Sequence, residues 1–550
     1  MKKISMKKNS FVEGTVLASI SLILIKFLGA VYVIPFYSIV GSLGGALYSY
    51  AYTVYSLIIN ICTAGIPLAV SKIVSEYNTL EMYEAKERTL KICNKFIIIL
   101  SIVLFLIMFI FAKEAAYLFI GNTTGGNSIE DIELVIRSIS FCLLIVPLLA
   151  VKKGYLQGQK FISVSTNSQL IEQIVRISFL LVGSYLAIKV YHLKTSIGVS
   201  IAVFSAFIAG LSAYIYLEYK IKKNKKELNI TKDMKRDKVS NKTIFNKIIK
   251  FSIPLIIMSI TIDLYNMVDL SLIIRGLSYL GYSGKEAEVI GSIMATWASK
   301  ICLIVNAVAY SLGISLIPYM VSSLVKKDYK TINKHFIKSL GIIIVIGLPM
   351  SVGISILAKE LYTIFYGASE YGTIILRLLP FSVLYSNFNF VVTMVLQSLN
   401  KFKTIYLSTG VGLLINALLD VPLIILCNKI GIYPYYGAIF STMIGTTISL
   451  VISLKSLKKD LKLKLSYLLE IIKKEILPIV SMILSVLIVY IMIHNSFNTR
   501  LTMLITCILC ALVGAIVYFI VAYKNGLLYD VMGEDYVNRI LIKLKLKRKE

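Results

Sequence analysis

Hydrophobic and polar positions alternate along this chain on the scale of whole helices. Apolar runs of about 20 residues, the length that an α-helix needs to cross a bilayer, recur throughout the sequence. Short polar segments separate these runs, and every second one is rich in lysine. The pattern predicts an all-α polytopic membrane protein with about fourteen spans, near residues 14–36, 46–70, 92–112, 134–151, 164–187, 195–217, 248–272, 288–320, 336–357, 373–397, 404–427, 436–455, 472–493 and 501–523.

An internal repeat indicates how these spans are grouped. The segment AKEAAYLFIG at 112–121 recurs as AKELYTIFYG at 358–367, and one repeat unit holds six predicted spans. Because six is even, both copies share one topology and are related by an axis along the membrane normal. We therefore expect two parallel six-helix lobes, at 1–217 and 248–457, joined by a basic linker at 218–247. Two extra helices and a basic tail follow at 458–550.

The charge distribution predicts the orientation of the chain. Lysine and arginine concentrate in alternate short loops, with the richest run in the linker, and the intervening loops are nearly uncharged or acidic. By the positive-inside rule, both termini and the linker are expected in the cytoplasm. The net charge of +29 would suggest nucleic-acid binding in a soluble protein, but no nucleic-acid motif accompanies it, so we expect no nucleic-acid partner.

The sequence offers little for metal, redox or catalytic chemistry. Cys507 and Cys510 have metal-like spacing but lie inside an apolar helix without histidine or carboxylate partners, so neither metal nor cofactor is expected. No phosphate-binding GxxxxGK[ST] loop is present. A membrane enzyme would need catalytic groups in an outward loop, whereas His192, His335 and His494 are scattered near span ends. We expect a protein that is not an enzyme.

A polar stripe crosses the apolar segment 164–187. Its residues fall at i, i+3, i+4 and i+7, which is one helical face: Gln169, Glu172, Gln173 and Arg176. A charge near the bilayer centre costs roughly 2.5–3.5 kcal/mol, so such residues usually face a bundle interior or a water-filled cavity. Two interpretations stay open at this point. Either the stripe lines a cavity, or Glu172 and Arg176 neutralise each other as an i, i+4 pair within a helix contact.

Other polar residues lie deep in predicted spans. Lys26 is in the middle of the first span, and Lys300 stands beside the single tryptophan and ahead of Asn306. Asp269, in the seventh span, is expected either to take a cation or to stabilise a helix contact, with Arg275 as a candidate partner. Fixed cations in a low-dielectric cavity suit an anionic substrate, particularly a phosphate or pyrophosphate. The candidate cavity set is Lys26, Glu172, Gln173, Arg176, Asp269, Lys300 and Asn306.

Three segments resemble one known family. YLQGQKFISVSTNSQLIEQIVRISF, GIPLAVSKIVSEY and KFLGAVYVIPF are similar to the stage V sporulation protein B group of polysaccharide exporters. That group is close to the MurJ-type lipid II flippases of the multidrug/oligosaccharidyl-lipid/polysaccharide superfamily. The resemblance implies two lobes, fourteen helices and export of a lipid-linked saccharide precursor. It also implies that Lys26 and Lys300 stand where the flippases have cavity arginines, whereas further arginines of that group fall on Tyr32 and near Ile59 or Asn60.

Together these features predict a flippase for an undecaprenyl-pyrophosphate-linked, lipid II-like peptidoglycan precursor in cell-wall or spore-cortex synthesis. It would work as a monomer by alternating access in the bacterial plasma membrane. Its partners would be the lipid-linked saccharide, membrane lipids and cell-wall synthesis enzymes. The alternative is a cation-coupled multidrug exporter of the same superfamily, in which Asp269 or Glu172 would carry the coupling.

Overall fold

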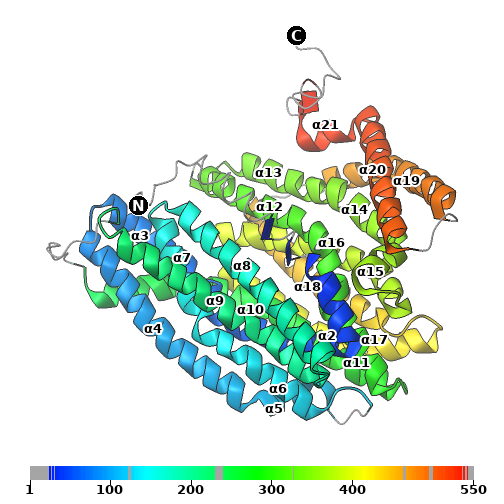
Figure 1. Ribbon diagram of the computed structural model, residues 1–550. Helices are drawn as coiled ribbons and strands as arrows, with labels where there is room; N and C mark the ends of the chain where they lie inside the picture. Colours follow the sequence, from blue (N-terminus) through cyan, green and yellow to red (C-terminus); the bar gives the residue numbers. More distant parts are fainter. Residues whose placement is uncertain are drawn as a thin grey trace. The chain divides into compact units, whose positions relative to one another are not determined.

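The described part of the chain is helical. The computed structural model (Figure 1) describes residues 24–25, 28–29, 31–121, 125–228, 239–325, 328–461, 466–494, 499–534, 537–538 and 542. Within these ranges the chain forms helices joined by short connections, and no β-strand occurs among them. The helices fall into two compact units, which divide at Ser292 and Ile293.

The first unit is built from long helices that pack side by side. In Figure 1 they run from blue to green, with α3, α4, α7, α8 and α9 visible as neighbours. The helices are α2 (Val33–Thr63), α3 (Ile66–Thr79), α4 (Tyr83–Ile110), α5 (Ala112–Ile120), α6 (Ile129–Ser140), η1 (Phe141–Leu144), α7 (Val146–Gly158), α8 (Ile162–Tyr185), η2 (Leu186–Val190), α9 (Thr195–Lys223), α10 (Asn241–Tyr279) and α11 (Gly284–Ser292).

The second unit has its own core and ends in an antiparallel helix pair, α19 and α20, followed by the short α21. Three five-residue turns in the described residues are π-helical, η2 in the first unit and η3 and η4 in the second. The helices are η3 (Ile293–Trp297), α12 (Ala298–Val325), α13 (Tyr329–Ile342), η4 (Ile343–Gly347), α14 (Leu348–Ile356), α15 (Ala358–Tyr366), α16 (Glu370–Ser398), α17 (Phe402–Lys429), α18 (Tyr436–Leu461), α19 (Ser466–His494), α20 (Arg500–Lys524) and α21 (Leu527–Met532).

Thirteen helices in the described residues are long and apolar enough to cross a membrane. They correspond in order to the second through fourteenth predicted spans. The first predicted span, 14–36, lies largely outside the described residues. The prediction of an all-α, multi-pass membrane protein is confirmed, because no other environment accommodates this many apolar helices in one chain.

A break inside α2 marks the boundary between the first two predicted spans. Gly41 has φ +70° and ψ −173°, which is not helical, and its φ lies in the region that favours glycine. The residues before it continue the first span and those after it begin the second. The uncharged loop expected between these spans is therefore a single sharp turn.

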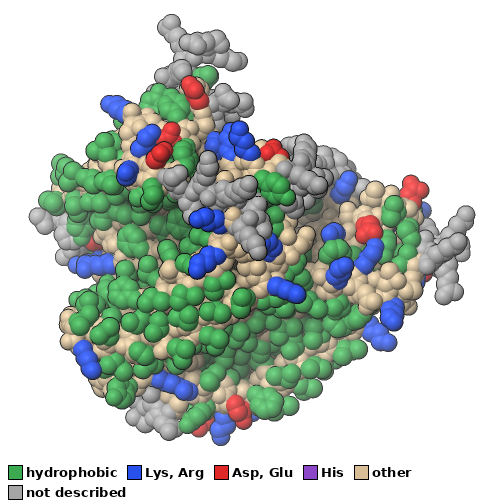
Figure 2. Space-filling model, turned by 180° about the vertical axis from the view of Figure 1, so that it is seen from behind, with side chains coloured by type: hydrophobic (Ala, Val, Ile, Leu, Met, Phe, Trp, Pro, Cys, Tyr) green, Lys and Arg blue, Asp and Glu red, His purple; other side chains and the backbone are tan. Residues whose placement is uncertain are grey.

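Side chains on the outer face of the helices are apolar, as lipid contact requires. On α4 the exposed residues Ile99, Ile102, Val103, Leu106 and Ile110 follow i, i+3, i+4 spacing, which is one helical stripe. Figure 2 shows hydrophobic side chains covering continuous areas of the visible surface. In water such areas would favour aggregation, whereas in a bilayer they are the expected surface.

The repeated sequence segment forms the same structure in both places. The two copies are the nine-residue helices α5 and α15, and each follows directly on another helix, α4 and α14 respectively. Each ends at a glycine with positive φ, +55° at Gly121 and +90° at Gly367. A residue with a side chain is strained in this conformation, which explains the glycine at the end of both copies.

The boundary between the two compact units differs from the boundary between the two lobes that the sequence predicts. Helices α10 and α11 belong to the expected second lobe, yet they pack with the first unit. The hydrogen bond from the Asn60 amide on α2 to the Asp263 carboxylate on α10, at 2.6 Å, is one such contact. The six-plus-six division therefore stays a prediction about sequence equivalence and topology.

Side-chain caps fix where several helices begin. Each capping oxygen accepts the backbone N–H three residues on, which satisfies one of the free donors of the first turn. At Asp328, the Thr331 hydroxyl and backbone N–H donate to the carboxylate and hold its pKa below the usual value. The capping residues are Ser128, Ser240, Asp328, Ser369 and Thr499.

Close approach of α3 and α7 positions the start of α8. A Cβ added to Gly154 would lie 2.4 Å from the backbone oxygen of Pro67, and one added to Gly158 would lie 2.5 Å from that of Ser71. The two glycines are four residues apart on one face of α7, so the backbones touch without intervening side chains. This packing holds α7 at the point where the chain turns into α8.

Candidate functional site

Helix α8 carries the polar stripe, and the turn before it brings the stripe alongside α7. Lys160 has φ +67°, a left-handed conformation that reverses the chain direction. The Gln157 amide donates to the Ser165 hydroxyl across this turn at 3.0 Å. Helix α8 therefore packs against α7 on one side and against α2 on another.

Glu172 forms an ion pair with a residue of α7. Its Oε2 lies 2.6 Å from the Nζ of Lys153, and the two side chains are 23% and 15% exposed. The sequence had offered Arg176 as the partner, but the described residues show no ion pair between Glu172 and Arg176. Because a half-buried carboxylate needs a nearby cation, Lys153 satisfies Glu172 and leaves Arg176 for another role.

Arg176 lies on the same face as Glu172, one helical turn away, and contacts α2. Its guanidinium carbon is 5.4 Å from the centre of the Tyr52 ring, a cation–π geometry. Among the described residues no carboxylate lies within ion-pair distance of this guanidinium. Tyr52 stacks on Tyr48 with ring centres 4.3 Å apart, and the Tyr48 hydroxyl is hydrogen-bonded to that of Tyr32 at 3.1 Å.

Gln173 lies close to the segment that follows Lys26 in the sequence. A Cβ added to Gly29 would be 3.5 Å from the side-chain nitrogen of Gln173. Lys26 itself lies outside the described residues. The structure thus brings Glu172, Gln173 and Arg176 together on α8, against α2, α7 and the neighbourhood of Gly29.

Asp269 lies on α10, half-buried, in the first unit. Arg275, its candidate partner, donates from Nη2 to the backbone oxygen of Leu118 at 2.8 Å instead. That contact ties the C-terminal part of α10 to the last turn of α5. The buried carboxylate on α10 that the structure does connect to α2 is Asp263, only 7% exposed.

Lys300 and Asn306 lie on α12 in the second unit. The Nζ of Lys300 is 4.5 Å from the centre of the Trp297 ring, and Trp297 is fully buried. The Trp297 carbonyl accepts a hydrogen bond from the Tyr366 hydroxyl at 2.9 Å, which fixes the turn before Lys300. Asn306 is half-buried two turns further along the helix.

Sequence reasoning missed three buried carboxylates. Glu288, Glu360 and Glu475 are each at most 3% exposed. Glu288 accepts the backbone N–H of Asn127 at 2.8 Å, and Tyr490 donates to Glu360 at 2.6 Å. For Glu360 and Glu475 the available signal was a single acidic residue in AKELYTIFYG and IIKKEILPIV, whereas Glu288 follows another glutamate, Glu286, and gave no such signal.

Within the described ranges, no group of three or more His, Cys, Asp or Glu side chains is placed to hold a metal ion. Cys507 and Cys510 are buried thiols, and both lie in the apolar core of the second unit.

Breaking the Glu172–Lys153 pair is expected to destabilise the first unit. Lys153→Met would leave a half-buried carboxylate without its cation. We expect the free energy of unfolding to fall by about 2 kcal/mol, which lies between the effects of breaking an exposed and a buried ion pair. Thermal unfolding of the purified protein in detergent would measure it. The double variant with Glu172→Gln should recover most of the loss. A double variant no more stable than Lys153→Met would contradict the pairing.

Comparison with known families places residues 11–324 in the family described as "Polysaccharide biosynthesis protein". The lipid II flippase MurJ of Bacillus subtilis (strain 168) is 32% identical over 447 residues, covering 80% of this chain and 80% of that protein. Stage V sporulation protein B of the same organism is 22% identical over 412 residues, covering 74% and 77%.

Solved structures show the same fold. The inward closed conformation of a lipid II flippase MurJ matches with a TM-score of 0.64 and 16% identity, covering 94% of this chain and all of that one. The inward-facing conformation of a multidrug resistance MATE transporter of the MOP superfamily matches with a TM-score of 0.63 and 14% identity, covering 82% and 98%. Because these two scores are almost equal, the fold alone does not choose between a flippase and a drug exporter.

Proposed function

Because the chain belongs to the polysaccharide biosynthesis protein family, we propose that it moves a lipid-linked saccharide across the membrane. The proposed substrate is an undecaprenyl-pyrophosphate-linked peptidoglycan precursor of the lipid II type. The relative at 32% identity, whose printed name is a lipid II flippase, supports this choice. The proposed role is in cell-wall or spore-cortex synthesis, and the relative named for stage V of sporulation supports the second of these.

One observation carries the proposal: a guanidinium in a membrane-spanning helix without an acidic partner in the described structure. Arg176 lies over Tyr52, while the nearby Glu172 is neutralised by Lys153. A cation inside the membrane requires a compensating anion, and the planar guanidinium binds phosphate oxygens through paired N–H donors. The diphosphate of the substrate would supply this anion when the head group enters the cavity.

Transport would proceed by alternating access. The head group would enter from the cytoplasm and bind Arg176, together with Lys26 and Lys300, while the lipid tail remains in the bilayer. Gln173 and Asn306 would contribute neutral hydrogen bonds to the saccharide. Rocking of the two expected lobes would then expose the head group outside, with both termini of a monomeric protein in the cytoplasm of a bacterial cell.

Transport of fluorescent lipid II in proteoliposomes tests this function. Lys26→Ala and Lys300→Ala are each expected to lower the transport rate about 10- to 100-fold, because each removes one charge-assisted contact of about 1.5–3 kcal/mol. Native mass spectrometry of the purified protein should detect a co-purified lipid pyrophosphate. Unchanged transport in both variants, with no bound lipid, would rule the function out.

A drug exporter is the second candidate, since the MATE match has a TM-score of 0.63. That function needs carboxylates that are open to a cationic substrate or coupling ion. Glu172 is already paired with Lys153, and Asp269 is the other carboxylate named for this role. Ethidium efflux that disappears with Asp269→Asn, alongside inert lipid II transport, would favour this alternative.

A further inference from the structure

Glu475 is a carboxylic acid in the interior of the second unit. It lies on α19, in a stretch apolar enough to cross the membrane, and is 1% exposed. Helix α19 packs against α20, α13, η4 and α21. Ile471, one turn before Glu475 on α19, belongs to the apolar core that these elements share. An ionised carboxylate at such a position needs a cation or several hydrogen-bond donors.

The hydrogen bonds around Glu475 contain one proton too few for an ionised carboxylate. The Tyr518 hydroxyl on α20 lies 2.7 Å from the Oε1 of Glu475 and 2.7 Å from the backbone oxygen of Val345 in η4. A phenol has a single O–H donor. If both neighbours were acceptors only, one of the two 2.7 Å contacts would join two oxygens without a hydrogen atom between them.

A proton on Glu475 resolves the contradiction. The protonated Oε1 donates to the Tyr518 oxygen, and the Tyr518 hydroxyl donates to the Val345 carbonyl, so each contact holds one hydrogen atom. The other carboxyl oxygen, Oε2, is buried and accepts no hydrogen bond from the described residues. A neutral acid tolerates that position far better than a carboxylate does.

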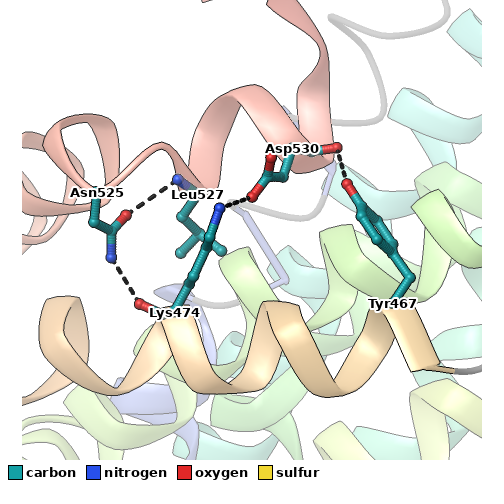
Figure 3. Close-up of polar contacts among 5 residues, drawn as sticks. All are labelled: Tyr467, Lys474, Asn525, Leu527 and Asp530. Atoms are coloured by element: carbon teal, nitrogen blue, oxygen red, sulfur yellow. Dashed lines mark hydrogen bonds and ion pairs between the residues drawn. The ribbon is translucent and has the colours of Figure 1, made fainter.

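No cation takes the place of this proton in the described surroundings. The adjacent Lys474 points to α21, where its Nζ lies 2.5 Å from the Asp530 carboxylate (Figure 3). The α13 residue Lys338 lies toward Gly533, where an added Cβ would be 3.6 Å from its Nζ. The titratable side chain that faces Glu475 is Tyr518, and η4 contributes only the Val345 carbonyl.

We propose that Glu475 is a proton-binding site within the membrane, and that its proton ties α20 to the π-helical turn η4 through Tyr518. When the proton leaves to water, the Tyr518 hydroxyl turns from Val345 to the carboxylate, and no other proton is transferred. The Val345 carbonyl then loses its donor from α20. Protonation therefore controls a contact between the C-terminal helix pair and the turn between α13 and α14.

This site is independent of the transported substrate, so its test does not require transport. Infrared spectra of the protein in lipid nanodiscs at neutral pH report the C=O stretch of protonated carboxyl groups. The wild-type minus Glu475→Gln difference spectrum is expected to contain one such band per protein molecule. Glu470→Gln, which removes an exposed carboxylate of the same helix, should leave that band in place.

A second variant tests the hydrogen bond between the Glu475 carboxyl group and Tyr518. In Tyr518→Phe the acid loses its acceptor, so the band should persist but move to higher frequency, as a carboxyl group without a hydrogen bond absorbs. Identical spectra of the wild type and folded Glu475→Gln would overturn the proposal. So would a band that Tyr518→Phe leaves unmoved. Deuterium exchange, which shifts bands of protonated acids, confirms the assignment.

Discussion

Gly154→Ala is expected to destabilise the protein by about 3 kcal/mol, the upper end of the cost of overpacking a well-packed interior. The added Cβ would lie 2.4 Å from the backbone oxygen of Pro67. Because the obstacle is backbone and not a flexible side chain, α3 and α7 must separate. Their separation moves the turn at Lys160 from which α8 begins. Thermal unfolding and the yield of monodisperse protein in detergent would measure the effect.

Gly353→Ala is the matched control. It makes the same change inside the transmembrane helix α14, where an added Cβ meets no atom within 4 Å. Alanine is the better helix former by about 1 kcal/mol, so this variant should be as stable as the wild type or slightly more so. If Gly154→Ala unfolded at the same temperature as Gly353→Ala, the close contact of α3 and α7 would be wrong.

Arg176→Ala is expected to reduce lipid II transport in proteoliposomes by about 10- to 100-fold, the equivalent of one charge-assisted hydrogen bond of about 1.5–3 kcal/mol. The side chain rests on Tyr52 and has no carboxylate partner in the described structure, so its removal leaves no acid uncompensated. The variant should therefore fold normally. Arg176→Lys should keep part of the activity, because lysine retains the charge but lacks the planar fork of donors.

Arg137→Ala controls for the loss of an arginine as such. Arg137 on α6 is paired with Glu133 at 2.8 Å and donates to the Phe109 carbonyl at 3.2 Å. These contacts already satisfy the guanidinium, so we expect transport close to that of the wild type. Equal transport by Arg137→Ala and Arg176→Ala would remove Arg176 from the binding site.

The helices could be predicted from the sequence because the bilayer dictates their length and composition. Thirteen predicted spans match described helices, and the repeated segment forms the same short helix twice. The partner of Glu172 could not be predicted in this way. Helical spacing made Arg176 the nearest cation, but the turn at Lys160 folds α8 back on α7 and brings Lys153 closer. That turn depends on one left-handed residue, which no periodicity reveals.

Contacts between residues far apart in the sequence could not be predicted either. Asn60 and Asp263 are 203 positions apart, and Glu475 and Tyr518 are 43 apart on different helices. A single acid in an apolar run indicates that a partner exists, but not which residue it is. The packing of α10 with the first unit is likewise a tertiary result, since sequence equivalence assigns that helix to the second lobe.

The boundary between the two compact units has a consequence for the register of α12. It falls at η3, inside the helical stretch from α11 to α12, where no loop joins the units. A π-helical turn holds about one residue more than an α-helical turn, and each residue of an α-helix is rotated about 100° around the helix axis from the one before it. A one-residue change in length there would keep the helix intact and rotate everything after it. The direction in which Lys300 and Asn306 point from α12 therefore depends on the number of residues in η3.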